Sequence, residues 1–394
     1  MLRGLILGVV LFPGISFAID PSPFSLRATG PDSTSDLFSV IHANEQFIAV
    51  GAASNPPGPY GFGPAIVRYS LDGVNWGLTE LTNAFAPSLH DVVHANGLYV
   101  GVGGREGGNL WTSSDGTNWT LQSEMCCAFS GVTSGPQGFV AVGGFWPLLS
   151  TVIVTSPDGI IWTSRDSGIT NNFITDPRRM LAVTYGNGRY VAVGATGSIV
   201  TSLNAANWTP ISEEPTTNHL GAIIFTNGGF LAVGTSGVTL KSVTGTAWTQ
   251  VTTGITNTLR AITYANGTYV VVGDGGVIAT STDGNTWSRA RSDVTTALYG
   301  VCYGNGTFVV VGEGGVILQS PDFLRPGLQI VSGPSGFDVV VSLSEFGRQY
   351  RVEASATPAF MTPTTLGTYA NSHTNIVIRD GATNTMRFYR VISP

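Results

Sequence analysis

One short turn sequence recurs along this chain at nearly regular intervals, and that recurrence restricts the possible folds more than any other feature. The stretch "STDGNTW" ends at Trp287. Related stretches end at Trp76, Trp119, Trp162, Trp208 and Trp248, which are 39 to 46 residues apart. Self-similarity with such a period is typical of repeat architectures such as solenoids and propellers.

A single repeat divides into four short candidate strands, at 259–264, 268–272, 277–281 and 286–291. The separators "ANG", "GDGG" and "TDG" contain the Asn and Gly residues that tight turns need for positive φ angles. Four antiparallel strands repeated about every 42 residues predict the blades of a β-propeller.

The first strand of the repeat has seven copies. They begin at Leu37, Leu89, Phe129, Met180, Leu220, Leu259 and Leu298. The seventh copy lacks the fourth strand that would carry a tryptophan, and residues 22–29 resemble that missing strand, with Phe24 at the position of Trp287. We therefore predict an all-β chain with a seven-bladed β-propeller closed by an N-terminal strand, which removes open sheet edges.

The two ends of the chain differ from the repeats. Residues 1–18 combine Arg3, a short apolar run, and Ser16 and Ala18 at positions −3 and −1 of a cleavage site, as in a secretory signal peptide. The apolar run is shorter than a membrane span of about 20 residues. We expect domains at 1–18 (signal peptide), 19–326 (propeller) and 327–394 (small β-sandwich). The protein is then secreted, periplasmic or on a bacterial cell surface, without a transmembrane segment.

Charge and cysteine content exclude several classes of function. The formal net charge is −6, and Lys241 is the single lysine. Nucleic-acid binding needs clustered cations, so we expect no nucleic-acid partner. Three cysteines, two of them adjacent, do not form a disulfide framework.

The recurring turn has a structural explanation. An Asp such as Asp283 accepts backbone N–H groups within its own turn, Gly284 adopts a positive φ, and Trp287 packs against the neighbouring blade. Asn204, which replaces the Asp in the fourth blade, is compatible with the same turn. The motif is therefore interpreted as a joint of the architecture and not as a site repeated many times.

These turns resemble those of Asp-box (bacterial neuraminidase repeat) propellers, which include sialidases, and of the seven-bladed photosystem II assembly factors. The resemblance covers residues 22–325 and implies the fold. Sialidases carry an early Arg-Ile-Pro-like motif, which Arg178, Arg179 and Arg325 do not match. The stretches "YRVEAS" and "RFYRV" look like C-terminal modules of secreted planctomycete and verrucomicrobia proteins, which implies an attachment or spacer role.

No catalytic residue, metal site or cofactor site emerges from the motifs. His90 and His94 lie about 13 Å apart on a strand, too far to share one ion. The glycine-rich segments lack the helix and the Gly-Lys-Ser/Thr of a phosphate loop, and no nucleophile elbow is present.

Insertions interrupt the repeat on one face only. The turn between strands two and three is long in blades one to three, and the connection before blade four is long too. We expect one rim to gather Tyr60, Phe62, Arg105, Glu106, Phe145, Trp146, Asp176, Arg178 and Arg179. Aromatic rings beside Arg and carboxylates suit a sugar or a peptide. The alternative is that Phe145 and Trp146 merely cover a blade edge.

A second candidate group lies at the central channel. The second position of each first strand holds Phe38, His90, Ser130, Leu181, Gly221, Arg260 and Tyr299. We expect His90, Arg260 and Tyr299 to point into the channel as ligand-binding residues, unless the loops cap them.

These features predict an exported, non-enzymatic propeller that binds a glycan or an extracellular protein through the face with the insertions of blades 1–4. The alternative is a polysaccharide-active enzyme, a glycoside hydrolase or a lyase, that uses carboxylates of the same face. The candidates are Glu106, Asp176, Asp274, Asp293 and Glu313. A third hypothesis, an assembly factor for a membrane complex, rests on the family resemblance.

Overall fold

The computed structural model describes most of the repeat region and part of the tail. The described residues are 24–28, 35–53, 64–82, 88–104, 107–125, 127–144, 151–169 and 179–320, with the backbone of six strands between 327 and 392. The chain divides into two units, one of which comprises Ser22–Pro321 and the other of which contains Asp322–Pro394. Each unit is described by itself.

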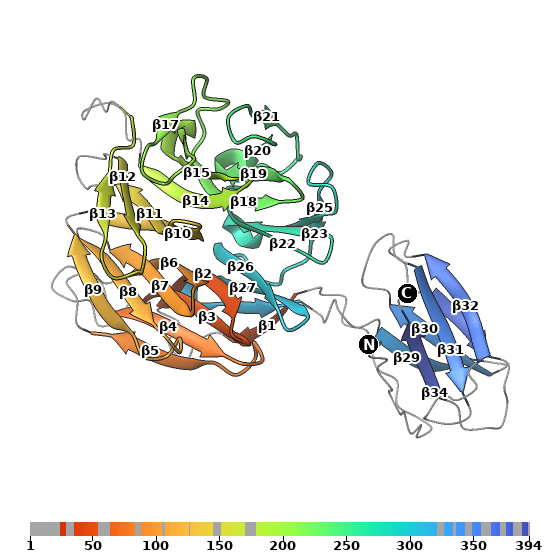
Figure 1. Cartoon of the computed structure of the whole chain (residues 1–394). Helices are drawn as coiled ribbons and strands as arrows, with labels where there is room; N and C mark the ends of the chain where they lie inside the picture. Colours follow the sequence, from red (N-terminus) through yellow and green to blue (C-terminus); the bar gives the residue numbers. More distant parts are fainter. Residues whose placement is uncertain are drawn as a thin grey trace. The chain divides into compact units, whose positions relative to one another are not determined.

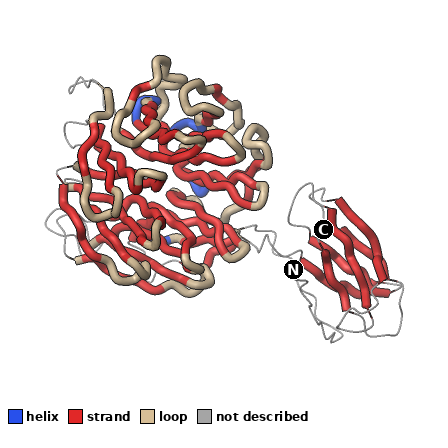
Figure 2. The backbone as a smooth tube through the Cα atoms, in the orientation of Figure 1, coloured by secondary structure: helices blue, strands red, loops and turns tan. Residues whose placement is uncertain are grey.

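The larger unit is a ring of seven antiparallel sheets, each with four strands (Figures 1 and 2). This confirms the predicted seven-bladed propeller. Blade 1 contains β2 (Ser35–Ala43), β3 (Gln46–Ala53), β4 (Ala65–Ser70) and β5 (Gly77–Leu81). Blade 2 contains β6 (Leu89–Ala95), β7 (Leu98–Gly104), β8 (Gly108–Ser113) and β9 (Thr120–Met125). Blade 3 contains β10 (Ala128–Gly135), β11 (Gly138–Gly144), β12 (Thr151–Ser156) and β13 (Thr163–Arg165).

Blades 4 to 6 repeat this order with shorter outer strands. Blade 4 contains β14 (Met180–Gly186), β15 (Arg189–Gly194), β16 (Ile199–Ser202) and β17 (Thr209–Pro210). Blade 5 contains β18 (Leu220–Thr226), β19 (Gly229–Gly234), β20 (Thr239–Ser242) and β21 (Thr249–Gln250). Blade 6 contains β22 (Leu259–Ala265), β23 (Thr268–Gly273), β24 (Ile278–Ser281) and β25 (Ser288–Ala290).

Blade 7 is assembled from both ends of the ring. It contains β26 (Leu298–Gly304), β27 (Thr307–Gly312), β28 (Ile317–Gln319) and β1 (Ser25–Ala28). Ser25 pairs with Gln319 in this blade, and Ser288 pairs with the equivalent Thr280 in blade 6. Phe24 therefore takes the place of Trp287, as predicted, and it is fully buried.

The closing strand contains one irregularity that the sequence alignment did not anticipate. The register shifts between Leu26 and Ala28, so Arg27 is an extra residue that no partner opposes. Its Nε donates to Gln319 Oε1 at 3.0 Å, which returns the side chain to the strand next to it. A bulge of this kind lets an edge strand turn away from the ladder.

Short helical turns connect strands two and three in blades 4 to 7. They are η1 (Ala195–Gly197), η2 (Thr235–Gly237), η3 (Asp274–Gly276) and η4 (Glu313–Gly315). A Cβ on Gly197 would lie 1.8 Å from the Thr216 carbonyl oxygen, so only glycine fits where this turn meets the connection to blade 5. In the part of the chain that the structure describes, no helix has the length and apolar character to cross a membrane.

The recurring turns have the hydrogen bonds expected of a joint. In blade 6, Asp283 Oδ1 accepts the backbone N–H groups of Asn285 and Thr286 at 2.7 and 2.8 Å, and Ser281 Oγ accepts that of Gly284 at 2.8 Å. The predicted fourth strand, 286–291, is shorter in the structure because the Thr286 N–H belongs to this turn. β25 begins only at Ser288.

The tryptophans stabilise the contact between one blade and the blade before it. Trp208 of blade 4 is 5% exposed and packs in one cluster with Val140 and Val142 of blade 3. Its ring also lies 6.2 Å from that of Tyr190. Burial of such large apolar groups between sheets is the main source of stability in a ring of repeats.

The smaller unit is known from its strands. They are β29 (Gly327–Gly333), β30 (Gly336–Ser342), β31 (Gln349–Ser355), β32 (Thr364–Ala370), β33 (Ile376–Asp380) and β34 (Phe388–Ile392). They form two three-stranded sheets in the orders β29-β30-β33 and β32-β31-β34. The β-sandwich predicted for this segment stays a prediction.

Candidate functional site at the centre of the ring

The innermost strand of every blade carries a bulge at the same position. A register shift in each of β2, β6, β10, β14, β18, β22 and β26 leaves one residue out of the ladder. The residue left out is always the one at the second position of the predicted first strand, the position singled out in the sequence. Bulges next to functional sites re-aim side chains that a regular ladder would leave in its plane.

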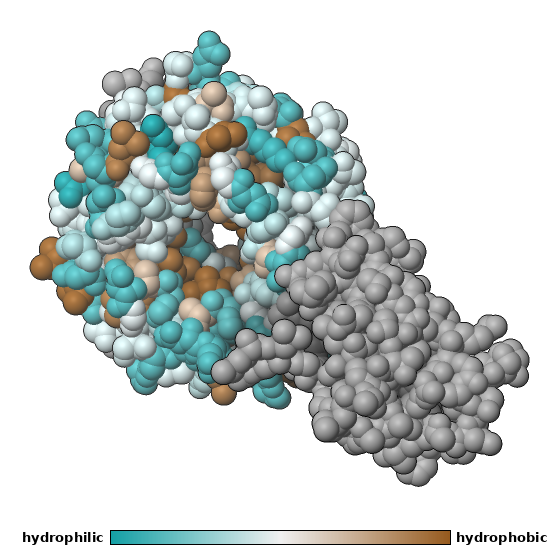
Figure 3. Space-filling model, turned by 45° about the vertical axis from the view of Figure 1, so that its right-hand side comes forward, coloured by the Kyte–Doolittle hydropathy of each residue, from teal (hydrophilic) through white to brown (hydrophobic). Residues whose placement is uncertain are grey.

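The seven bulged residues line one cavity of about 530 Å³. They are Phe38, His90, Ser130, Leu181, Gly221, Arg260 and Tyr299. The cavity also touches Arg179, Ala195, His219, Gly234, Thr235, Thr258 and Leu259. These residues lie at or just before the start of an inner strand, or at the end of a second strand and in the turn that follows it. The cavity therefore opens on the face from which the insertions branch. Figure 3 shows a central opening in the ring.

Four bulged side chains form a continuous arc across blades 6, 7, 1 and 2. The Arg260 guanidinium lies 5.2 Å from the Tyr299 ring centroid, a cation–π distance. The Tyr299 and Phe38 centroids are 5.6 Å apart, and the Phe38 and His90 rings meet edge to face at 5.4 Å. The other three bulged residues, Ser130, Leu181 and Gly221, line the cavity from blades 3, 4 and 5.

Arg260 is held in place by a carboxylate of its own blade. Its Nε and Nη2 donate to Asp274 Oδ1 and Oδ2, the second bond at 3.1 Å, which is the two-pronged geometry that guanidinium and carboxylate favour. The Arg260 side chain remains 42% exposed. It is therefore oriented, partly neutralised and accessible from the cavity.

His90 is held by two hydrogen bonds. Its Nδ1 lies 2.9 Å from the Phe129 carbonyl oxygen, so Nδ1 carries the proton, and Nε2 accepts from Ser88 Oγ at 3.0 Å. Burial lowers the pKa of His90, and the positive charge of Arg179 lowers it further, against the effect of the Phe129 bond. His90 is thus neutral at pH 7, and it contributes a polar, uncharged side chain to the cavity lining.

The cavity lining contains two arginines and two histidines but, among the residues that the structure describes, no Asp or Glu. No described carboxylate forms an ion pair with Arg179. Arg179 and Arg260 are thus the charged groups of the lining, and Arg260 is paired with Asp274. The exposed Arg179, which has no carboxylate partner among the described residues, favours an anionic ligand.

His219 and Thr258 belong to the site although the sequence did not single them out. Each directly precedes the first strand of its blade, as Arg179 precedes Met180. His219 Nδ1 accepts the N–H of Thr196 at 2.9 Å, which links the site to η1. Both residues stand at the position directly before the first strand, so comparing that position across the repeats of the sequence would have identified them.

Most of the predicted rim falls outside the described residues. The rim residues in this category are Tyr60, Phe62, Arg105, Glu106, Phe145, Trp146, Asp176 and Arg178. Of the predicted rim, Arg179 is described, and it lines the cavity together with His90, Arg260 and Tyr299. The structure therefore brings the channel residues together and leaves the rest of the rim as a prediction.

Three of the carboxylates considered for catalysis have structural partners. Asp274 binds Arg260, Asp293 pairs with Arg291 at 3.2 Å, and Glu313 Oε2 accepts the N–H of Ala297 at 3.1 Å. The other two, Glu106 and Asp176, lie outside the described residues. No group of three His, Cys, Asp or Glu side chains suited to a metal ion occurs in the described part of the chain.

A half-buried carboxylate lies one residue beyond His90. Asp91 accepts hydrogen bonds from Ser39 Oγ of blade 1 at 2.8 Å and from the Val132 N–H of blade 3 at 2.9 Å. Burial raises its pKa to about 6, although these bonds oppose the shift. Asp91 thus joins the three blades from which the insertions branch.

Comparison with known proteins gives the fold without a family. No family model and no curated protein matches the chain. Among solved structures, a streptogramin B lyase is similar with a TM-score of 0.61 and 14% identity, over 75% of this chain and 97% of that one. YCF48 from Cyanidioschyzon merolae is similar with a TM-score of 0.56 and 20% identity, over 76% of this chain and 98% of that one. YCF48 bound to D1 peptide has a TM-score of 0.57 and 16% identity, over 77% of this chain and 98% of that one.

Proposed function

We propose that this protein is an exported binding module whose central cavity takes an acidic segment of a partner protein. The observation that carries the proposal is the convergence of all seven bulged residues on one cavity lined by aromatic and cationic groups. A cavity of about 530 Å³ is within the range of sites that accept a short peptide or a small ligand.

The lining offers partners for both the apolar groups and the carboxylates of an acidic peptide segment. Phe38 and Tyr299 offer apolar surface to a main chain or an aliphatic side chain, while Arg179 and Arg260 offer charged donors to a carboxylate. YCF48, which was solved bound to D1 peptide, has a similar fold, so a propeller of this kind can bind a peptide.

The contacts of the described carboxylates favour binding over catalysis. Asp274, Asp293 and Glu313 each hold an arginine or a backbone N–H, so a structural role accounts for them. Similarity to a lyase at 14% identity concerns the fold alone.

The proposal is tested by selection from a peptide display library with the full chain, followed by calorimetry on the enriched peptides. We expect enrichment of peptides with Asp, Glu or a free carboxylate. Arg179→Gln and Phe38→Ala should each weaken binding about tenfold or more, as for central residues of an interface. Arg291→Gln, on the exposed part of blade 6, is the matched control and should leave affinity unchanged.

Two results would overturn the proposal. One is enrichment that ignores charge, or affinity that neither cavity substitution changes. The other is turnover of a polysaccharide that Glu313→Gln or Asp274→Asn abolishes with the fold intact, which would establish the hydrolase or lyase instead.

A further inference from the structure

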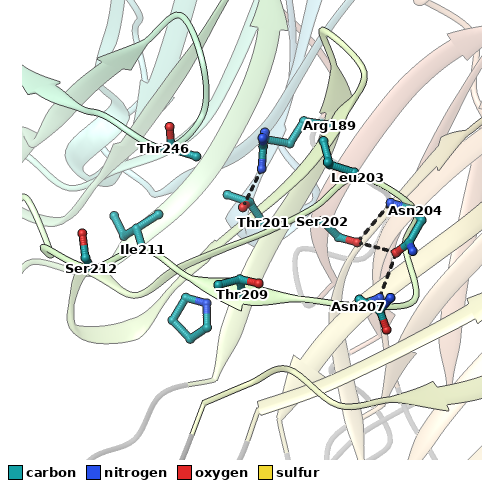
Figure 4. Close-up of a pocket in the computed structure, with 11 residues that line it drawn as sticks. Arg189, Thr201, Ser202, Leu203, Asn204, Asn207, Thr209, Ile211, Ser212 and Thr246 are labelled. Atoms are coloured by element: carbon teal, nitrogen blue, oxygen red, sulfur yellow. Dashed lines mark hydrogen bonds between the residues drawn. The ribbon is translucent and has the colours of Figure 1, made fainter.

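A second cavity, of about 590 Å³, lies away from the channel, between the outer parts of blades 4 and 5 (Figure 4). Its lining is Arg189, Thr201, Ser202, Leu203, Asn204, Asn207, Thr209, Pro210, Ile211, Ser212 and Thr246. All but Thr246 belong to blade 4 or to the segment that follows its outer strand. Seven of these eleven residues carry a hydroxyl or an amide group, one carries a positive charge, and the rest are apolar.

The turn of blade 4 has lost the carboxylate that the equivalent turns carry. Asn204 Oδ1 accepts the N–H groups of Ala206 and Asn207 at 3.0 and 2.9 Å, so the turn keeps its shape without the charge. In blade 2, by comparison, Asn118 Nδ2 donates to Asp115 Oδ2 at 2.7 Å. The amide groups of Asn204 and Asn207 make no such bond within the described structure and remain available beside the cavity.

The turn of blade 5, on the other side of the cavity, has lost its carboxylate too. Thr244 occupies the position of the Asp, and its hydroxyl lies 2.9 Å from that of Thr246. Blades 1, 2, 3 and 6 retain the acid, as Asp72, Asp115, Asp158 and Asp283. The two turns without a carboxylate are therefore neighbours, and the cavity lies between them.

Arg189 is the charged group of this cavity. Its Nη1 donates to Thr201 Oγ1 at 3.0 Å, and no described carboxylate pairs with it. At the next boundary, Lys241 of blade 5 donates to Asp283 O and Asn285 Oδ1 of the blade 6 turn. Burial lowers the pKa of Lys241, and the nearby Asp283 carboxylate opposes that shift. The turn facing Arg189 offers no such charge, so the guanidinium is not neutralised.

We propose that the cavity between blades 4 and 5 binds an acidic sugar, a uronate unit of a polysaccharide. Arg189 would bind the carboxylate, and the amides of Asn204 and Asn207 would bind ring hydroxyls. Leu203, which is 64% exposed, and Ile211 give apolar surface for the sugar ring. Glu213 and Glu214 follow Ser212 in sequence, but neither lines the cavity. This site is independent of the central cavity.

The test is calorimetry of the full chain with a galacturonic acid oligosaccharide and with the uncharged galactose oligomer of equal length. Measurable binding of the acidic oligomer, at least tenfold tighter than that of the neutral one, is expected. Arg189→Gln should weaken binding about tenfold or more, because the sole cation is removed.

Asn204→Asp separates binding from folding. It restores the residue of the other turns, which accepts the same two N–H groups, so the unfolding midpoint should stay the same or rise. It also places a negative charge beside the cavity, and affinity for the acidic oligomer should fall about tenfold or more. Asp283→Asn in blade 6 makes the reverse exchange away from the cavity and should leave affinity unchanged.

Equal affinity for both oligomers, no binding at millimolar concentration, or binding that survives both Arg189→Gln and Asn204→Asp would overturn the proposal. Weak binding of acetate is compatible with it only if the acidic oligomer binds at least tenfold more tightly, because acetate has no hydroxyls for the amides.

Discussion

Two features recur around the ring: the turn between strands three and four, and the bulged residue of the inner strand. The turn keeps its residues from blade to blade, whereas the bulge keeps its geometry and changes its residue. The turns keep Ser and Trp at fixed places, with Gly between them in every turn except that of blade 4, where Ala205 stands, because those residues make the bonds and contacts of a joint. The inner strands keep only the bulge and change the residue, from Gly221 to Arg260. A residue that recurs in the repeat is thus explained by structure, whereas a recurring geometry with variable residues is what the proposed binding site requires.

The largest expected effect is on the turn side of this comparison. Trp208→Ala removes a side chain that is 5% exposed and packed against blade 3, and should lower the free energy of unfolding of the propeller by about 3–5 kcal/mol. Urea denaturation followed by tryptophan fluorescence measures it. Phe38→Ala, at the cavity, should cost about 1 kcal/mol, since the half-buried ring mainly loses its aromatic contacts. Equal losses of unfolding free energy in Trp208→Ala and Phe38→Ala would contradict the distinction between a structural turn and a cavity residue.

Phe24→Ala extends the comparison to the blade without a tryptophan. The ring is fully buried at the equivalent position, so its removal should cost about 3 kcal/mol in the same assay. Leu26→Ala, two residues along the same strand and 49% exposed, is the control and should change stability by less than about 0.5 kcal/mol. A similar effect of the two substitutions would mean that the N-terminal strand does not close the ring as described.

The pH dependence of stability tests the contribution of Asp91, next to the bulged His90, against that of a turn carboxylate. Its pKa is about 6 in the folded protein and near 3.9 when unfolded, so the folded state takes up the proton first as pH falls. Between pH 7.5 and 5, wild type should gain about 1.5 kcal/mol of unfolding free energy relative to Asp91→Asn, which has no proton to gain. Urea titrations at both values measure the gap, and a gap that stays constant contradicts a half-buried, protonatable Asp91.

The carboxylate of a turn should respond in the opposite direction. Backbone N–H groups of Asn118 and Thr117 and the Asn118 side chain hold the pKa of Asp115 well below its usual range. Its contribution is complete above the unfolded value near 3.9 and is lost as pH falls through the folded pKa. Asp115→Asn should therefore cost about 1 kcal/mol at pH 7 and progressively less below pH 3, in denaturant titrations. A cost that grows in acid would refute this assignment.

Much of the fold can be predicted from the sequence because each repeat carries the same pattern of strands and turns. The spacing of the tryptophans and the seven first strands led to the ring, and the likeness of residues 22–29 to the missing strand led to its closure. The channel residues followed from one repeated position. The bulge that aims them did not, since a bulge leaves no mark in the local composition.

What remained hidden depends on which blades are neighbours in space. The sequence does not single out Asp91, because its partners, Ser39 and Val132, lie in two other repeats. The exchange at Asn204 is visible in the sequence and is compatible with the turn. That it lies beside the Thr244 turn, Arg189 and a cavity is visible only in the structure.

The pairing of Ser25 with Gln319 also has a consequence for biosynthesis. During synthesis, β1 finds its partner only after nearly three hundred further residues have been made. A prematurely terminated chain that lacks β28 cannot form the last blade, and two blade flanks stay exposed to proteases. Completion of the ring thus acts as a length check, and such long-range pairing makes the final step of folding slow.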